Sequence, residues 1–549
     1  MQSANKWLKS GEPWIWLNAG AVAISMTVVL ALLAFILVRG LGHFWAGDVY
    51  EITYINDDKS LRLFGEVIKK ESVNREKRGL PAAEDGNEFL ERWSVKTGNR
   101  ELWADFRWVD EPAIESVRLP DDLVVLERTE WGSFYGYLRS VSEGSTLVAE
   151  GEASWSEFVT RVERVSEIRD EIRSLQRGEM SRVNYQLEQL RLKGRALQLK
   201  GSDTPAALAI LAEKKAGLQS KFDALMVQLT SLNDKIERDT AKFEVMDGQV
   251  VDIALADVIE GLKPNSMNVW QKSVHYVHAF WGFMMDDPRE ANTEGGVFPA
   301  IFGTVLMVLL MSILVTPFGV ISAVYLKEYA SQGFVTRIVR IAVNNLAGVP
   351  SIVYGVFGLG FFVYFLGGSL DQLFYPEAAP APHFGTPGLM WASFTLALLT
   401  LPVVIVSTEE GLSRIPRNLR EGSLALGATK AETLWKVVLP MASPSIMTGL
   451  ILAVARAAGE VAPLMLVGVV KLAPELPLDG NFPFLHMERK FMHLGFHIYD
   501  VGFQSPNVEA AQPLVYATAF LLVLIIVVLN LSAIVMRNNL REKYRGIAG

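Results

Sequence analysis

The residues best placed for chemistry are an arginine and a glutamate four positions apart in an apolar stretch. Arg456 and Glu460 lie in "VARAAGEVAPLM", residues 454–465, within an apolar run from Ile446 to Val470. On one helix, positions four apart share a face. Ionisable residues inside a membrane usually face the bundle interior or a water-filled path, which makes them functional candidates. The donor fork of an arginine matches the oxygens of an oxyanion.

Two interpretations of this pair stand side by side. In the first, Arg456 contacts an anion during translocation, and Glu460 neutralises the arginine and prevents the anion from being held too tightly. In the second, the pair only locks helices together. Asn345 and Ser351, with Asn344, are possible path-lining residues, although polar residues near a helix start are as often caps.

Composition narrows the class of protein. The chain has 549 residues, half of them hydrophobic, no cysteine and a formal charge of −8. Its length suggests two or more domains, and its hydropathy excludes a soluble enzyme. Disulfides and thiolate metal sites are excluded, and the acidic balance without a basic stripe argues against nucleic-acid binding. His493 and His497 are one helical turn apart but lack a carboxylate motif, so we expect neither a metal site nor an independent active site.

Six apolar runs are long enough to cross a membrane. They are residues 15–38, 297–326, 338–366, 388–408, 444–470 and 513–536. The first has no small-residue cleavage site and is typical of a retained signal-anchor. Lys and Arg concentrate before the first run, after the second, after the fourth and after the sixth. Under the positive-inside rule, both termini are cytoplasmic, and residues 46–296 are periplasmic in a bacterial inner membrane.

The polar block between the first two runs divides at a change of period. Residues 46–154 alternate polar and apolar residues and predict a β-rich unit. Residues 155–246 carry apolar positions at heptad spacing, which predicts an antiparallel coiled-coil hairpin standing above the membrane. Its turn "GSDTP" offers Thr204 as a helix cap and Pro205 at the first helical position. The block is either a spacer or stability module, or a docking or gating surface for an outside partner.

The most specific motif is "EGSLALGATKAETLWKVVLP", residues 421–440. It reads as a helix, a glycine break at Gly427 and a second helix that Pro440 ends before the next span. The motif resembles the EAA coupling loop of ABC-importer permeases, whose pattern is EAA-x3-G-x9-I-x-LP. Gly422, Ser423 and Val437 replace two alanines and the isoleucine. The resemblance implies that Glu421, Gly427, Leu439 and Pro440 belong to a loop that docks on a separate ATPase.

The chain itself lacks a nucleotide site. Gly422 and Gly427 have phosphate-loop spacing, but Ala428 and Thr429 follow where Lys and Ser or Thr are needed. We therefore expect no cofactor in this chain, with ATP and Mg bound by the partner ATPase.

Two further stretches narrow the resemblance. "NNLAGVPSIVYGVFGLGFF" (344–362) and "FMHLGFHIYD" (491–500), together with "ARAAGEVAPL", resemble phosphate-importer permeases of the PstA type. The resemblance covers roughly residues 297–540; the long 46–296 insertion departs from the family form. The resemblance implies an α-helical membrane protein with six transmembrane helices of the type I ABC importer permease fold. The sequence adds a large extracytoplasmic insertion between helices 1 and 2.

The expected segments combine the sequence patterns with this resemblance, and the expected partners follow from the resemblance alone. The segments are 1–45 (tail and first helix), 46–154 (β-rich), 155–246 (hairpin), 247–296 (connection), 297–540 (permease domain) and 541–549 (tail). The implied partners are two copies of an ATP-binding ABC subunit, a second related phosphate permease and a periplasmic phosphate-binding protein, with membrane lipid around the bundle.

Other functions compete with phosphate import. Within transport, the substrate could be another oxyanion, namely molybdate, sulfate or phosphonate, since arginine chemistry does not separate these. A membrane sensor or scaffold is a different class, but it would need few spans and a cytoplasmic output domain, whereas this chain has six runs and only short cytoplasmic segments.

Overall fold

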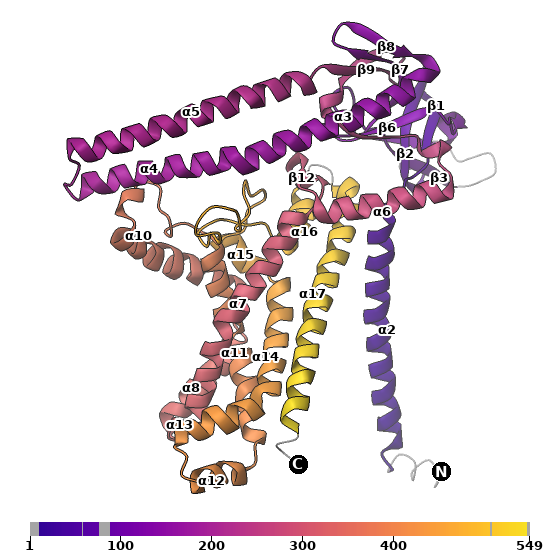
Figure 1. Ribbon diagram of the computed structural model, residues 1–549. Helices are drawn as coiled ribbons and strands as arrows, with labels where there is room; N and C mark the ends of the chain where they lie inside the picture. The colour runs from indigo at the N-terminus through magenta and orange to yellow at the C-terminus, as the bar shows by residue number, and fades with distance from the viewer. Residues whose placement is uncertain (1–9, 57–58, 76–87, 506–507, 546–549) are drawn as a thin grey trace, which may run out of the picture.

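The computed structural model describes residues 10–56, 59–75, 88–505 and 508–545. It has a long helical bundle with a folded insert at one end (Figure 1). The first and last described residues and residues 421–440 lie at the opposite end. We call these ends the insert side and the coupling side. The basic residues Lys6 and Lys9, used for orientation, lie outside the described residues.

The described residues contain six helices long and apolar enough to cross a membrane, which confirms the number of spans. Their bounds are Trp14–Gly42, Phe298–Tyr329, Ser351–Phe374, Leu389–Arg414, Lys430–Gly459 and Ala511–Lys543. As elements, they are α2 (Glu12–Gly42), α7 (Phe298–Val324) with η8 (Tyr325–Tyr329), α9 (Ser351–Phe357) with η9 (Gly358–Gly367) and α10 (Gly368–Phe374), α11 (Leu389–Arg414), α13 (Lys430–Thr433) with η11 (Leu434–Val438) and α14 (Leu439–Gly459), and α17 (Val508–Arg545). Shorter elements between them are η10 (Pro376–Ala378), α12 (Arg417–Ala425), α15 (Ala462–Val467), α16 (Leu494–Tyr499) and η12 (Asp500–Gln504).

The predicted third and fifth runs are displaced along the chain. Residues 338–366 do not form one helix: α8 (Phe334–Leu346) ends before Pro350, and the span begins at Ser351. Proline disfavours helical backbone in the residue before it, which separates the two helices. The fifth span is Lys430–Gly459 rather than 444–470. It starts earlier because the coupling segment continues into it, and it ends at a break discussed below.

The β-rich unit contains two antiparallel sheets. One has the strand order β4-β3-β2-β1-β5, and the other has the order β10-β9-β7-β6-β11, with β8 paired to β7. The strands are β1 (Val49–Asn56), β2 (Lys59–Asn74), β3 (Phe89–Lys96), β4 (Phe106–Asp110), β5 (Ile114–Arg118), β6 (Leu123–Arg128), β7 (Phe134–Glu143), β8 (Thr146–Glu150), β9 (Asp239–Glu244), β10 (Val250–Ala254) and β11 (Val258–Leu262). The second sheet therefore takes strands from both sides of the hairpin.

The boundary of residue 246 for the hairpin is accordingly wrong. The helical part ends at Ile236, and residues 239–262 return to the sheet. The alternation of "DTAKFE" is short, and it follows directly on the apolar spacing of the helix, so the two periods merge in the sequence. The predicted connection 247–296 also contains β10, β11, the helix α6 (Val269–Met285) and the short pair β12 (Pro288–Arg289) and β13 (Glu294–Gly295).

Two helical arms leave this sheet. One is formed by α3 (Ser154–Leu175), the π-helical turn η4 (Gln176–Met180) and α4 (Ser181–Leu199), and the other by α5 (Pro205–Ile236). Met180, Val183, Leu225 and Leu229 are buried between them. The Thr204 side chain accepts a hydrogen bond from the amide of Ala207, which confirms the predicted cap.

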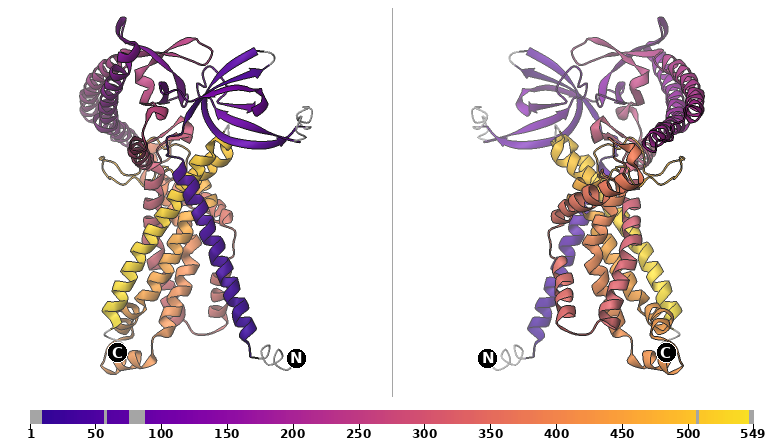
Figure 2. Two further views of the ribbon diagram at one scale, coloured as in Figure 1. Left: turned by 90° about the vertical axis from the view of Figure 1, so that its right-hand side faces the viewer. Right: turned by 90° about the vertical axis from the view of Figure 1, so that its left-hand side faces the viewer.

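The hairpin lies across the insert side of the bundle instead of standing away from it. In Figure 1, α4 passes over α10, and Figure 2 separates the hairpin and the β unit to opposite sides of the bundle top. The Tyr185 hydroxyl donates to the carbonyl of Phe482, and the rings of Tyr185 and His486 lie 6.1 Å apart. These contacts, with packing of α4 on η10, hold the arm down on the loops.

A buried ion pair anchors the base of the hairpin to the sheet. Asp239 on β9 is fully buried, its Oδ1 lies 2.7 Å from Nη1 of Arg161, and its other oxygen accepts from Arg164. Both arginines lie on α3. Removing one partner of a buried pair leaves uncompensated charge, which typically costs about 3–5 kcal/mol.

We expect Asp239→Asn to lower the free energy of opening of α3 by about 3 kcal/mol, measured by hydrogen exchange on the full chain. Asp252→Asn is the matched control. Its carboxylate is exposed on β10, 3.9 Å from Lys242, so its loss should change the opening free energy by less than about 0.5 kcal/mol. Equal protection of α3 in both variants would show that the ion pair does not anchor the arm.

Candidate functional site

The fifth span breaks immediately after its predicted charge pair. The helix α14 ends at Gly459, Glu460 has extended backbone (φ −81°, ψ 130°), and α15 starts at Ala462. Pro463 explains the break, because a proline lacks the amide hydrogen and its ring clashes with the carbonyl four residues earlier, that of Gly459. Arg456 and Glu460 therefore share a face across a helix end instead of along a continuous helix.

The pair is nevertheless formed. Nε of Arg456 lies 3.5 Å from Oε1 of Glu460, and both side chains are partly buried. Arg456 also occupies the last turn of α14, where the free carbonyls favour a cation. A pair separated by 3.5 Å, with the guanidinium only singly engaged, leaves donors available for a passing anion. This geometry is compatible both with an arginine that contacts an anion and with an ion pair that only joins helices.

Three segments that resemble the permease family converge on this break. A methyl group at Gly355 of α9 would lie 2.7 Å from Cα of Pro463, and one at Gly495 of α16 would lie 2.6 Å from Cγ2 of Val461. Both glycines therefore permit close approach that a side chain would block. The stretches around residues 355, 461 and 495, far apart in the sequence, form one junction.

The other predicted path residues separate. Ser351 is half-buried at the first position of α9, after the N-cap residue Pro350, so it belongs to the helix that packs on α15. Asn345 is exposed near the end of α8. The hydroxyl of Tyr354 donates to the carbonyl of Leu346 at 2.7 Å and fixes the turn between these helices. Only Ser351 lies on the junction side of that turn.

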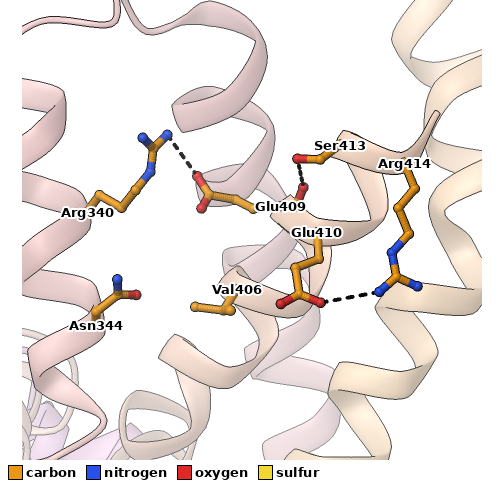
Figure 3. Close-up of a pocket in the computed structure, with 7 residues that line it drawn as sticks. All are labelled: Arg340, Asn344, Val406, Glu409, Glu410, Ser413 and Arg414. Carbon is orange, nitrogen blue, oxygen red and sulfur yellow. Dashed lines mark hydrogen bonds and ion pairs between the residues drawn. The ribbon is translucent and has the colours of Figure 1, made fainter. Parts of the chain in front are cut away.

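A polar pocket of about 480 Å³ lies between α8 and α11, nearer the coupling side (Figure 3). Its lining residues are Arg340, Asn344, Val406, Glu409, Glu410, Ser413 and Arg414. Nη2 of Arg340 lies 3.4 Å from Oε1 of Glu409, and Nη2 of Arg414 lies 3.7 Å from Oε2 of Glu410. Each arginine thus has a carboxylate beside it, as Arg456 does.

Sequence reasoning missed this pocket as a site. Arg340 is one of the basic residues after the second apolar run that set the predicted orientation, and neither Glu409 nor Glu410 was predicted as a site residue. The sequence feature that could have indicated a polar site is "STEEGLSR" (407–414), a charged stretch at the end of an apolar run. The pairing of Arg340 with Glu409 needs the packing of α8 on α11, which no spacing in the sequence reveals.

The segment 421–440 bends at its glycine as predicted. Gly427 has φ +88°, in the left-handed region, and no atom of the described residues outside its own turn lies within 4 Å of the position that a Cβ would take there. The amide of Gly427 donates to the carbonyl of Leu424, and the amide of Ala428 donates to that of Ser423. This is a Schellman cap, which ends α12 with the glycine at its left-handed position.

The second half of the segment differs from the prediction. Pro440 does not end a helix, because α13, η11 and α14 run on as one helical stretch, Lys430–Gly459. The π-helical turn η11 ends two residues before the proline, and its wider hydrogen-bond pattern lets the helical stretch continue past a residue without an amide hydrogen. Leu439 packs with Leu434 and Val438 in the apolar cluster beneath the segment, so Leu439 and Pro440 lie at its root.

The tip of the segment is apolar and open. Leu426 is 91% exposed and Trp435 is 71% exposed. Behind the tip, Nη2 of Arg420 lies 2.9 Å from Oε1 of Glu328, and Lys430 donates to the carbonyl of Glu328. The segment is therefore tied to η8 at its back and presents large apolar side chains at its front.

A buried polar group lies at the insert side of the junction. Asp500 is 1% exposed, and its Oδ2 lies 3.1 Å from Nζ of Lys471. Burial lowers the pKa of His497 to about 4; the carboxylate of Asp500 opposes this lowering, and Lys471 adds to it. His493 accepts a hydrogen bond from the amide of Gly495 through Nδ1. These groups stabilise α16 where it meets Val461.

Comparisons with known proteins now identify the class. Residues 315–546 match the family described as binding-protein-dependent transport system inner membrane component. The chain is 36% identical over 222 residues to the phosphate transport system permease protein PstA of Mycobacterium leprae, covering 39% of this chain and 67% of the relative. It is 34% identical over 262 residues to PstA 1 of Mycobacterium tuberculosis, covering 47% and 76%. The probable ABC transporter permease YqgH of Bacillus subtilis is 32% identical, over 35% of this chain and 59% of its own length.

The chain belongs to this family, the inner-membrane permease subunits of ABC importers, and is a multi-pass, non-catalytic membrane subunit. Within the family it is of the PstA type. Such permeases act with an ATPase and a substrate-binding protein. A chain of the inward-facing MetNI methionine ABC transporter matches at 19% identity and a TM-score of 0.32, over 44% of this chain and 94% of that one, which is too distant to add to the assignment.

Substitution of Gly427 tests whether the bend in residues 421–440 depends on its left-handed backbone conformation. We expect Gly427→Val to weaken the α12 cap by about 1–2 kcal/mol, since a side chain opposes the left-handed conformation. Hydrogen exchange of the amides of Gly427 and Ala428 measures this. Gly427→Asn is the control, because asparagine tolerates that region. Faster exchange in both variants to the same extent would mean that the bend does not depend on backbone conformation.

Proposed function

We propose that this chain is a permease subunit of an ATP-driven phosphate importer. In this proposal, Arg456 contacts the phosphate oxygens at the junction, Glu460 is the counter-ion, and residues 421–440 dock on the ATPase. The termini and the coupling side are cytoplasmic, and residues 46–296 are periplasmic. The names of the relatives support phosphate as the substrate.

One observation carries the proposal. The second half of the coupling segment, residues 430–440, and Arg456 belong to one helical stretch, Lys430–Gly459, which ends at the pair. A displacement of α13 by an ATPase therefore reaches Arg456 along this helical stretch. The tip at Leu426 is joined to α13 across the Gly427 bend by the hydrogen bond between the hydroxyls of Ser423 and Thr433, 2.9 Å apart. Because the stretch stops at Glu460, a shift of α14 changes the position of Arg456 relative to α15 and Glu460.

The polar pocket at Arg340 offers a second binding position for the anion. Arg340 lies nearer the coupling side than Arg456, and it also has a carboxylate 3.4 Å away. An anion that leaves Arg456 meets another guanidinium whose charge is already partly neutralised. Such compensated arginines bind an oxyanion weakly enough for release, whereas a bare buried arginine would hold it tightly.

The assembly follows the family. Two ATPase copies, each binding ATP and Mg, act on this chain and on a second related permease, and a periplasmic phosphate-binding protein delivers the substrate. Molybdate, sulfate or phosphonate is the alternative cargo, because the guanidinium of Arg456 fits their oxygens as well. Competition by each anion in the uptake assay described next separates these substrates.

A charge swap distinguishes anion contact at Arg456 from an ion pair that only joins helices. In reconstituted vesicles of the whole complex, we expect Arg456→Gln to reduce labelled phosphate uptake at least tenfold. The double variant Arg456→Glu with Glu460→Arg keeps an ion pair but moves the guanidinium by four residues, and we expect it to remain inactive. Recovery of uptake in the swapped variant, with normal assembly, would show that the pair only joins helices.

The exposed tip is tested separately. Leu426→Asp should abolish co-purification of the ATPase with this chain, because it places charge where an apolar side chain would enter the partner. Val227→Asp is the control, since Val227 is 70% exposed on α5 in the insert. Retention of the ATPase by the Leu426 variant would remove residues 421–440 from the docking surface.

A further inference from the structure

The far half of the hairpin has a charge opposite to that of the chain. Residues 181–221 contain eight basic side chains, all exposed, and three acidic ones, a balance of +5 in a chain of −8. The basic residues are Arg182, Arg191, Lys193, Arg195, Lys200, Lys214, Lys215 and Lys221, and the acidic ones are Glu188, Asp203 and Glu213. Such a segregated patch indicates an acidic neighbour.

Part of this charge lines a groove. A depression of about 480 Å³ between α4 and α5 is lined by Gln186, Gln189, Leu190, Lys193, Lys214, Gly217, Leu218 and Lys221. Three lysine ammonium groups and two amides offer donors, and two leucines offer apolar surface. Beyond the groove, Leu199 and Ile210 at the tip are both more than half exposed. Donors and aliphatic side chains together suit a loop of another protein.

Within its own chain, the hairpin already contacts an insert-side loop that is poor in basic residues. Tyr185 lies on the loop 479–486, and burial, with the carboxylates of Glu488 and Asp479, raises the pKa of the Tyr185 hydroxyl. The two insert-side loops of the chain are poor in Lys and Arg: residues 367–387 have none, and residues 471–512 have three against five Asp and Glu. Loops on that side of a membrane protein are generally depleted in basic residues.

The hairpin also extends past its own bundle. In Figure 1 the turn between α4 and α5 lies beyond α10, the last element of the third span. The face of that span carries exposed apolar side chains, including Val356, Phe357 and Phe361. The same span packs on α15 beside Arg456. A second permease that closes the path would face this span, and it would therefore lie under the tip.

We propose that residues 181–221 dock on the insert-side loops of the second permease chain, with the lysine groove receiving acidic side chains of those loops. This inference rests on the proposed function, which supplies the second permease. The hairpin would then join the two permeases on the insert side, resting on the loops of its own chain at Tyr185 and on those of the partner at its tip.

Photo-crosslinking in the assembled complex tests the contact. A photo-reactive amino acid at Leu199 or Ile210 should form an adduct with the second permease in membranes. The same residue at Val250, 57% exposed on β10, is the control and should form none. Adducts only with lipid, adducts only with the binding protein, or no adduct from the tip would each overturn the proposal.

Charge reversal tests the groove. Lys193→Glu, Lys214→Glu and Lys221→Glu together should reduce the adduct from Leu199 at least fivefold, while Lys59→Glu, Lys69→Glu and Lys242→Glu in the β unit should leave it unchanged. An undiminished adduct in the groove variant would remove the lysines from the contact. If the unaltered chain retains the ATPase and phosphate uptake but gives no tip adduct, only this inference fails; loss of ATPase binding and uptake in the unaltered chain would instead defeat the proposed function.

Discussion

The charge of Arg456 in an apolar bundle is the constraint on which the membrane part depends. An unpaired buried guanidinium would cost several kcal/mol. The chain reduces this cost in two ways at one point: Glu460 supplies a carboxylate 3.5 Å away, and the end of α14 supplies free carbonyls. The free carbonyls depend on Pro463, which stops the helix, whereas the Glu460 carboxylate follows from the four-residue spacing. The break thus adds a second stabilising contribution to the ion pair.

The same break dictates the packing around it. Short α15 leaves the line of α14, and α9 and α16 approach residues 461–463 closely at glycines 355 and 495, where a methyl group would collide with the backbone or side chain of those residues. Gly468 in turn meets the backbone of Gly388 at the start of α11. The glycines in these three stretches are therefore explained by the close backbone contacts at one bend.

Sequence patterns predicted what depends on local chemistry. Six apolar runs, the Thr204–Pro205 cap and the bend at Gly427 follow from hydropathy, side-chain hydrogen bonding and backbone freedom, and all are present. The predictions were wrong or incomplete where the structure depends on contacts between residues far apart in the sequence. The strand 239–244 pairs with β7, which precedes the whole hairpin, and Pro440 is accommodated by a π-helical turn. The pocket at Arg340 exists only because α8 packs on α11, so its residues looked unrelated in the sequence.

The insert is mechanically connected to the break, although it is built outside the bundle. Backbone hydrogen bonds join α15 and the loop after it to the start of α11: the amide of Gly388 donates to Val467, and that of Leu389 donates to Arg489. Arg489 pairs with Asp479 in the loop on which Tyr185 rests. A movement of α15 relative to α14 therefore displaces the surface under α4. Since the base of the hairpin is held by the buried Asp239 pair, such a displacement must either tilt the arm as a unit or detach it at Tyr185.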